Sequence, residues 1–146
     1  MGTVLVVYHS LGGNTKAAAE ALAEGAKGVP DTKVVLKTGL KATLDDLFSC
    51  DALAVGTPDY FSYMAGGLKD FFDRTFYPSQ GKVTDKPCGI FVTHGGGGKA
   101  VDSVQGMCRT FKLKLVGKPV LVKGAPDAAA KSELAALGKA LAEAAA

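Results

Sequence analysis

An uninterrupted apolar stretch that runs through a short polar loop directly into a helical pattern constrains the fold more than any other feature. Residues 3–8 are apolar and rich in β-branched side chains, which is typical of a strand buried on both faces of a parallel sheet. From Thr15 onward, Ala19, Leu22 and Ala26 recur at helical spacing, so one face of the following helix should pack on a core. This unit predicts an α/β protein.

The loop inside this unit has the composition of an anion-binding site. Gly12 and Gly13 let the backbone approach a ligand closely, and Ser10, Asn14 and Thr15 supply hydrogen-bond donors. The first N–H groups of a helix have no partner within the helix, and its dipole places partial positive charge there. The loop is neither a G-x-G-x-x-G motif nor a Walker loop. We expect it to bind a monoester phosphate such as that of FMN; a simple strand-to-helix turn is the alternative.

Strand and helix patterns alternate along the rest of the chain. Further strands are predicted at residues 33–37, 52–56, 88–93 and 119–123. Further helices are predicted after Thr43, with Asp46 as its capping partner, from Met64 to about Arg74, at residues 101–111, and near the C-terminus. This alternation calls for parallel strands joined by right-handed crossovers, with helices on both faces of the sheet. The 146 residues fit a single domain, 1–146.

Composition excludes several classes of protein. The three cysteines are odd in number and form no C-x-x-C pair, so we expect reduced thiols rather than a disulfide framework or a thiolate metal site. No apolar run reaches the length of a membrane span and no leader is recognisable, which predicts a cytoplasmic protein without membrane insertion. The net charge of +3 comes with few aromatic residues among the basic ones, so nucleic-acid binding is not expected.

Three unusual loops follow predicted strands, at residues 10–15, 56–64 and 93–98. Because ligands of open parallel sheets bind beyond the carboxyl ends of the strands, we expect these loops to meet at one site. Together with the whole chain, they resemble the flavodoxin family. The second and third loops are similar to the branch that contains flavodoxin-like quinone reductases and NAD(P)H-dependent FMN reductases. The first loop matches the family signature at Val6, Val7, Tyr8, Ser10, Gly13, Thr15, Ala19 and Leu22.

The resemblance implies a flavodoxin-like three-layer sandwich whose five parallel strands have the order 2-1-3-4-5. It also implies FMN as the cofactor, with its phosphate in the first loop and its isoalloxazine ring between the other two. No catalytic residue and no metal ligand is predicted. The predicted cofactor-binding residues are Ser10, Leu11, Gly12, Gly13, Asn14, Thr15, Thr57, Pro58, Asp59, Tyr60, Phe61, Thr93, His94, Gly95, Gly96, Gly97 and Gly98.

Residue types in the second and third loops suit a flat ring with polar edges. Tyr60 or Phe61 could stack on a flavin, and residues 95–98 expose backbone N–H groups without side-chain obstruction. Ordinary loop packing and a flexible turn are the respective alternatives. His94 directly follows the fourth predicted strand, where an imidazole could donate to flavin or substrate. A solvent-facing loop histidine is equally compatible with the pattern.

The sequence leaves more than one function open. The first is an electron carrier that serves a redox partner protein. The alternative is an NAD(P)H-dependent quinone or FMN reductase that works by two-electron hydride transfer. The absence of glycine between Thr57 and Ala65 favours two-electron chemistry, because a peptide flip there would place a non-glycine residue at positive φ. The short chain favours the carrier. A flavin-free interaction domain is a third, remote possibility, and no particular oligomeric state is predicted.

Overall fold

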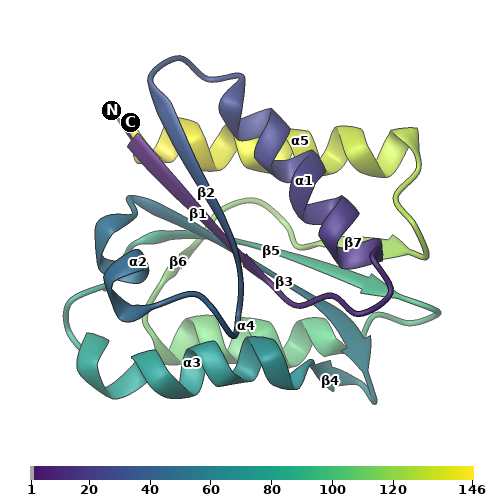
Figure 1. The fold of residues 1–146 in the computed structure, drawn as a ribbon, viewed down its shortest axis with the longest axis horizontal. Coiled ribbons are helices and arrows are strands. Elements are labelled where there is room, and N and C mark those ends of the chain that lie inside the picture. The colour runs from purple at the N-terminus through teal and green to yellow at the C-terminus, as the bar shows by residue number, and fades with distance from the viewer. Residues whose placement is uncertain (1) are drawn as a thin grey trace.

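The computed structural model describes residues 2–146 and has three layers, with one sheet between two layers of helices (Figure 1). Helices α1 and α5 cover one face of the sheet, and α3 and α4 cover the other. The strands are β1 (Gly2–Tyr8), β2 (Thr32–Thr38), β3 (Ala52–Tyr60), β4 (Tyr63–Met64), β5 (Pro87–His94), β6 (Lys114–Leu115) and β7 (Val120–Lys123). The helices are α1 (Asn14–Lys27), α2 (Leu44–Ser49), α3 (Gly66–Ser79), α4 (Ala100–Thr110) and α5 (Ala128–Ala145).

The parallel sheet has the order β2-β1-β3-β5, with β6 and β7 both paired to the outer edge of β5. Counting β5 and β7 as the fourth and fifth predicted strands, the predicted order 2-1-3-4-5 is confirmed. Two short strands share the edge of the sheet next to β5. Strand β6 pairs with Pro87 and Cys88, and β7 pairs with the last four residues of β5. Strand β1 has a partner on each side, and both of its faces pack against helices, which explains its unbroken apolar run.

Two core clusters lie on opposite faces of the sheet, and successive residues of β5 alternate between them. Phe91 belongs to the cluster under α1 and α5, whereas Val92 belongs to the cluster under α3 and α4. The Phe91 ring fits beside Gly56 because glycine has no side chain. A Cβ at this position would overlap the ring. This alternation fixes which helices the side chains at the end of β5 face.

The prediction for α3 was wrong at both ends. Met64 lies in β4, and the helix starts at Gly66 and continues past Arg74 through Pro78 to Ser79. Pro78 is tolerated because it lies in the last turn, where its missing N–H removes a single helical hydrogen bond. Phe76 holds this turn against the core by packing on Phe111, with ring centroids 5.2 Å apart. Tertiary packing therefore outweighs the local preference to end the helix before proline.

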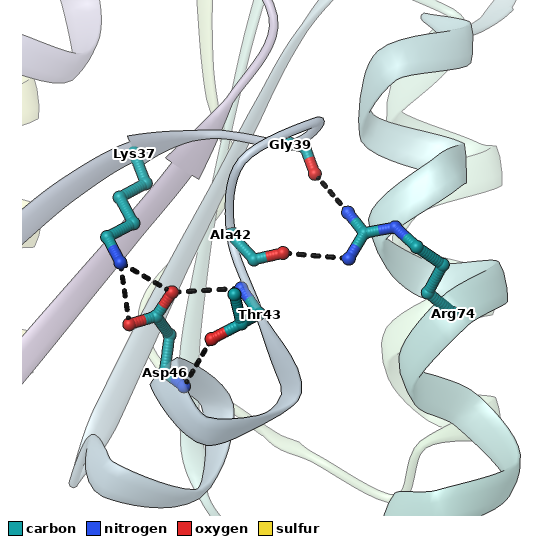
Figure 2. Close-up of polar contacts among 6 residues, drawn as sticks. All are labelled: Lys37, Gly39, Ala42, Thr43, Asp46 and Arg74. Atoms are coloured by element: carbon teal, nitrogen blue, oxygen red, sulfur yellow. Dashed lines mark hydrogen bonds and ion pairs between the residues drawn. The ribbon is translucent and has the colours of Figure 1, made fainter.

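Helix α2 is fixed at its start by the predicted capping box (Figure 2). Thr43 Oγ1 accepts from the Asp46 N–H at 3.1 Å, and the Asp46 carboxylate accepts from the Thr43 N–H at 2.9 Å. Lys37 Nζ of β2 also donates to Asp46, at 2.9 Å. Arg74 of α3 donates to the carbonyl oxygens of Gly39 and Ala42, so the loop that follows β2 is held against α3.

Candidate functional site

A cavity of about 340 Å³ lies at the carboxyl ends of β1, β3 and β5. Its wall includes most of the predicted site residues, drawn from all three predicted loops: Ser10, Leu11, Gly12, Asn14, Thr15, Pro58, Asp59, Tyr60, Thr93, His94 and Gly95. Gly124, which follows β7 and was not predicted, also lines the cavity. The six other predicted residues lie near it in the chain but do not line it: Gly13, Thr57, Phe61, Gly96, Gly97 and Gly98.

The first loop presents backbone donors to the cavity. Gly13 adopts a left-handed conformation with φ 102°, and its N–H donates to Ser10 Oγ at 3.1 Å. The first helical hydrogen bond runs from the Ala17 N–H to the Gly13 carbonyl, and no side chain in the described part of the chain caps α1. The amides of residues 14–16 form no hydrogen bond within residues 2–146 and are therefore available to an anion. A Cβ at Gly12 or Gly13 would meet nothing within 4 Å, so the loop is open on this side.

A buried hydrogen bond ties the first loop to the third. Thr15 Oγ1 lies 2.7 Å from Thr93 Oγ1, and these residues are only 2% and 3% exposed. Because Thr93 shares the face of β5 on which Phe91 packs, its side chain points toward α1. The predicted phosphate loop is thus attached to the end of the central strand β5.

The second predicted loop is mostly strand, which corrects the expectation of an irregular loop at residues 56–64. Strand β3 continues to Tyr60 and pairs with β4 as an antiparallel hairpin, in which Tyr60 lies opposite Tyr63. The two turn residues, Phe61 and Ser62, have φ values of 59° and 63°, as a two-residue type I′ hairpin turn requires. The Ser62 N–H donates to Asp59 Oδ1 at 2.8 Å. These local bonds hold a turn that lacks the usual glycine.

The hairpin places its two aromatic candidates in different environments. Phe61 is fully exposed at the tip and does not line the cavity. Tyr60 does line it, and its ring meets the His9 ring edge-on, with centroids 6.1 Å apart and an interplanar angle of 81°. His9 in turn abuts Gly67 of α3, where a Cβ would overlap the imidazole. His9 was expected either to pack or to face solvent, and its partner was not predicted, because only the fold brings it to Tyr60.

Asp59 and Thr57 fasten the hairpin to its surroundings. Asp59 Oδ2 accepts from the Ala100 N–H at 3.2 Å, at the start of α4. Thr57 Oγ1 accepts from the Ala65 N–H at 2.8 Å and donates to the Pro58 carbonyl at 2.7 Å. Ser103 Oγ accepts from the Met64 N–H at 3.0 Å. Both oxygens of Asp59 are thus engaged by backbone amides, and this carboxylate positions the second loop against the third.

The third loop leaves β5 through His94 and a run of glycines. Gly97 and Gly98 have φ values of 102° and 66°, which favour glycine, and a Cβ at Gly95 or Gly96 would meet nothing within 4 Å. The Gly124 N–H donates to the His94 carbonyl at 2.9 Å, which brings Gly124 to the cavity. His94 Nδ1 is buried and has no hydrogen-bond partner in residues 2–146. The loop thus combines open backbone with one unsatisfied imidazole nitrogen.

The cysteines contribute nothing to the cavity wall. All three are free and buried, with Cys88 Sγ 3.7 Å from Cys108 Sγ. The hydrogen bond with Cys108, together with burial, raises the pKa of the Cys88 thiol well above its usual range, and burial raises the pKa of Cys50 to about 11. Across the described residues, no group of His, Cys, Asp or Glu side chains could hold a metal ion, and no helix is long and apolar enough to cross a bilayer.

Comparison with known proteins places this site in context. Residues 3–127 match the family model described as NADPH-dependent FMN reductase. A flavodoxin from Aquifex aeolicus is 35% identical over 127 residues, which are 87% of this chain and 67% of that protein. An NAD(P)H dehydrogenase (quinone) from Chromohalobacter salexigens is 34% identical, over 82% of this chain and 72% of that protein.

Solved structures share the fold of this chain. A flavodoxin from the domain Archaea has a TM-score of 0.88 at 27% identity, and the match covers 97% of this chain and 96% of that chain. A flavodoxin, WrbA-like protein from Agrobacterium tumefaciens has a TM-score of 0.82 at 23% identity, with 99% and 98% covered. At that identity the second match supports the fold alone.

Proposed function

This chain belongs to the NADPH-dependent FMN reductase family, and we propose that it is a single-domain, cytoplasmic redox protein that transfers electrons through a non-covalently bound FMN. The family match and the flavodoxin relatives confirm the predicted family and cofactor. The observation that carries the proposal is the cavity itself, which joins an uncapped helix start, an aromatic ring and a glycine loop.

The residues around the cavity fit the chemical parts of FMN. The open glycines and free amides at the start of α1, with the Ser10 and Thr15 hydroxyls, would hold the phosphate. Tyr60 would contact the flat ring system, and the amide of Gly95, where the glycine run borders the cavity, would serve its polar edge. Bound FMN supplies reversible oxidation and reduction. The protein's own part is to bind the group, orient it and leave one side open to a partner.

A second candidate, an NAD(P)H-dependent quinone or FMN reductase, is favoured by the family match and by the quinone reductase relative. The rim of the site suits either function. Leu11 lines the cavity yet is 77% exposed, and Phe61 is fully exposed at the hairpin tip. Exposed apolar side chains at a cofactor site can dock a redox protein or cover a flat substrate such as a quinone. The two functions therefore share one surface and differ in what occupies it.

The first test is uptake of FMN and riboflavin, followed by quenching of flavin fluorescence. Because the proposed cradle contacts the phosphate, we expect FMN to bind at least tenfold more tightly than riboflavin, a difference of about 1.4 kcal/mol. Ser10→Ala should weaken FMN binding but not riboflavin binding, and Ser132→Ala, on an exposed position of α5, should affect neither. A protein that takes up no FMN would contradict the proposed function. Equal affinity for both flavins would contradict the phosphate cradle alone.

Steady-state assays then separate the two candidates. A reductase should oxidise NADPH or NADH in the presence of a quinone or free FMN faster than an equal concentration of unbound FMN does. A rate no faster than that of free FMN would exclude the reductase and leave the electron carrier.

A further inference from the structure

The two ring nitrogens of His94 lie in different environments. Nδ1 is buried without a hydrogen-bond partner. Nε2 also has no hydrogen bond to residues 2–146 but is not buried, and His94 lines the cavity. The ring therefore has one nitrogen enclosed by protein and one nitrogen accessible to a ligand.

The backbone holds this ring in place. His94 is the last residue of β5 and pairs with Lys123 of β7, and its carbonyl accepts from the Gly124 N–H at 2.9 Å. The ring itself lies beside Gly98, where a Cβ would stand 3.2 Å from His94 Cδ2. A side chain at Gly98 would crowd the imidazole, and the φ of 66° at this position also favours glycine. His94 is thus set between the strand edge and the glycine loop.

The environment of Nδ1 decides where a neutral ring carries its proton. A neutral imidazole has one donor and one acceptor nitrogen. If Nδ1 carried the proton, a buried N–H donor would have no acceptor, and orphaned buried N–H groups are rarer than orphaned acceptors. With the proton on Nε2, the donor is on the nitrogen that is not enclosed, and because His94 lines the cavity, a ligand or water there can accept it. The neutral ring should therefore be the Nε2–H tautomer.

The direction of the side chain decides which part of a ligand this donor meets. Successive side chains of a strand point to opposite faces, and Thr93 points toward α1, where it bonds Thr15. His94 therefore points to the other face, with Val92 and the side of the sheet that α4 covers. Asp59 bonds the start of α4 on that side. The imidazole is thus separated from the phosphate donors at the start of α1 and lies with the elements proposed to surround the ring.

We propose that His94 Nε2–H is a hydrogen-bond donor to the isoalloxazine ring of FMN and favours its reduced form, an inference that rests on the proposed function. Reduction adds electrons to the ring, so a donor at its polar edge stabilises the reduced form more than the oxidised form. Loss of this donor should reduce the preference for reduced over oxidised FMN roughly tenfold, because hydrogen bonds to charged groups are stronger than those between neutral groups. A tenfold change corresponds to about 30 mV in a two-electron couple.

A pair of variants tests which nitrogen acts. The amide nitrogen of His94→Gln can replace Nε2, whereas the shorter side chain of His94→Asn places its amide near Nδ1. The affinity for oxidised FMN is measured by fluorescence quenching, and the midpoint potential is measured against a reference dye. We expect H94N to lower the ratio of affinities for reduced and oxidised FMN roughly tenfold and H94Q to restore most of it. Equal effects of the two variants, or no effect of either, would overturn the assignment.

A measurement on the wild-type protein keeps the test independent of variant folding. The chain has only two histidines, His9 and His94, so ¹⁵N chemical shifts of labelled imidazoles can be assigned with a His9→Gln variant. Before FMN is added, the Nε2–H tautomer is expected for His94, and a neutral ring with its proton on Nδ1 would overturn the inference. A wild-type protein that takes up no FMN would overturn the proposed function as well, whereas normal FMN binding with the wrong tautomer overturns only the role of His94.

Discussion

The hydroxyl oxygens of Thr15 and Thr93 lie 2.7 Å apart although the two residues are 78 positions apart in the chain. One residue belongs to the first turn of α1 and the other to the end of β5. Because both residues are buried, this bond is shielded from water and fixes the helix start relative to the central strand. The geometry of the proposed phosphate cradle therefore depends on a residue from the third loop.

Replacing one hydroxyl of this pair should destabilise the protein. Thr93→Val keeps the shape of the side chain but leaves the Thr15 hydroxyl buried without its partner, which should cost about 1–3 kcal/mol of unfolding free energy. The double variant T15V/T93V leaves no unpaired hydroxyl, so its cost should be smaller than the sum of the two single variants. Urea unfolding of all four proteins measures the coupling, and additive effects would show that the bond contributes nothing.

The ion pair at α2 should make stability depend on pH. Burial alone would raise the pKa of Asp46, but hydrogen bonds from Lys37 and Thr43 outweigh it and lower the pKa below the ordinary 3.8. A carboxylate whose pKa is lowered by folding stabilises the protein above its ordinary pKa, and this contribution is lost as the pH falls through the folded-state value. The side chain of Lys37 is 39% exposed, so solvent screening limits the contribution of the pair to about 1 kcal/mol or less.

Asp46→Asn and the neighbouring Asp45→Asn provide the comparison for this effect. Asp45 lies in the same first turn and has no hydrogen bond or ion pair of its side chain among the described residues. The difference in stability between wild type and D46N should be constant from about pH 5 to 7 and should shrink below about pH 4. The corresponding difference for D45N should stay small at every pH. Equal pH profiles for the two variants would contradict the role of the Lys37–Asp46 contact.

Sequence patterns predicted the parallel sheet and where along the chain the three site segments lie, because both depend on local composition. Apolar runs mark β1 and β5, and Gly12 and Gly13 mark the first turn. The contact of His9 with Tyr60, and the position of Gly124, depend on which strand ends become neighbours in the folded sheet. Such pairings leave no periodic signal along the chain.

The hairpin was missed for a different reason. The usual sequence indication of a two-residue hairpin turn is Asn-Gly or Asp-Gly, and here Phe61 and Ser62 occupy the turn. The bond from the Ser62 N–H to Asp59, with the contacts of Asp59 and Ser103 to neighbouring elements, holds the turn in place instead. The absence of glycine between Thr57 and Ala65 therefore does not exclude positive φ there. Phe61 and Ser62 already have positive φ in the folded protein, so the conformational cost expected of a non-glycine residue is already present.

This turn should become more stable when Ser62 is replaced by glycine. A non-glycine residue in the left-handed region costs roughly 1–2 kcal/mol, and the greater freedom of glycine in the unfolded chain offsets about 0.5–1 kcal/mol of the gain. We expect Ser62→Gly to raise the unfolding free energy by up to about 1.5 kcal/mol. The same substitution at Ser132, in α5, should lower it, because glycine is a poor helix former. Denaturant unfolding distinguishes the two, and a loss of stability in S62G would contradict the strained turn.

Because α1 and α5 pack closely, replacing a helical glycine by alanine should lower stability at Gly25 of α1 but raise it at Gly106 of α4. A Cβ at Gly25 of α1 would overlap the carbonyl oxygen of Ala135, and a Cβ at Gly138 of α5 would overlap that of Leu22. The two helices therefore approach so closely that backbone faces backbone. Gly106, inside α4, has no heavy atom within 4 Å of a Cβ position, so alanine there meets open space.

Gly25→Ala should consequently destabilise the protein by about 1–3 kcal/mol, since α1 and α5 must separate to admit the methyl group. Gly106→Ala should stabilise it by about 0.5–1 kcal/mol through helix propensity alone. A shift of α1 also displaces its first turn, where the phosphate is proposed to bind, so G25A should bind FMN more weakly while binding by G106A is unchanged. If both variants gained stability equally, the close approach of α1 and α5 would be wrong; if G25A lost stability but bound FMN normally, the start of α1 would be positioned by β1 and Thr93 and not by α5.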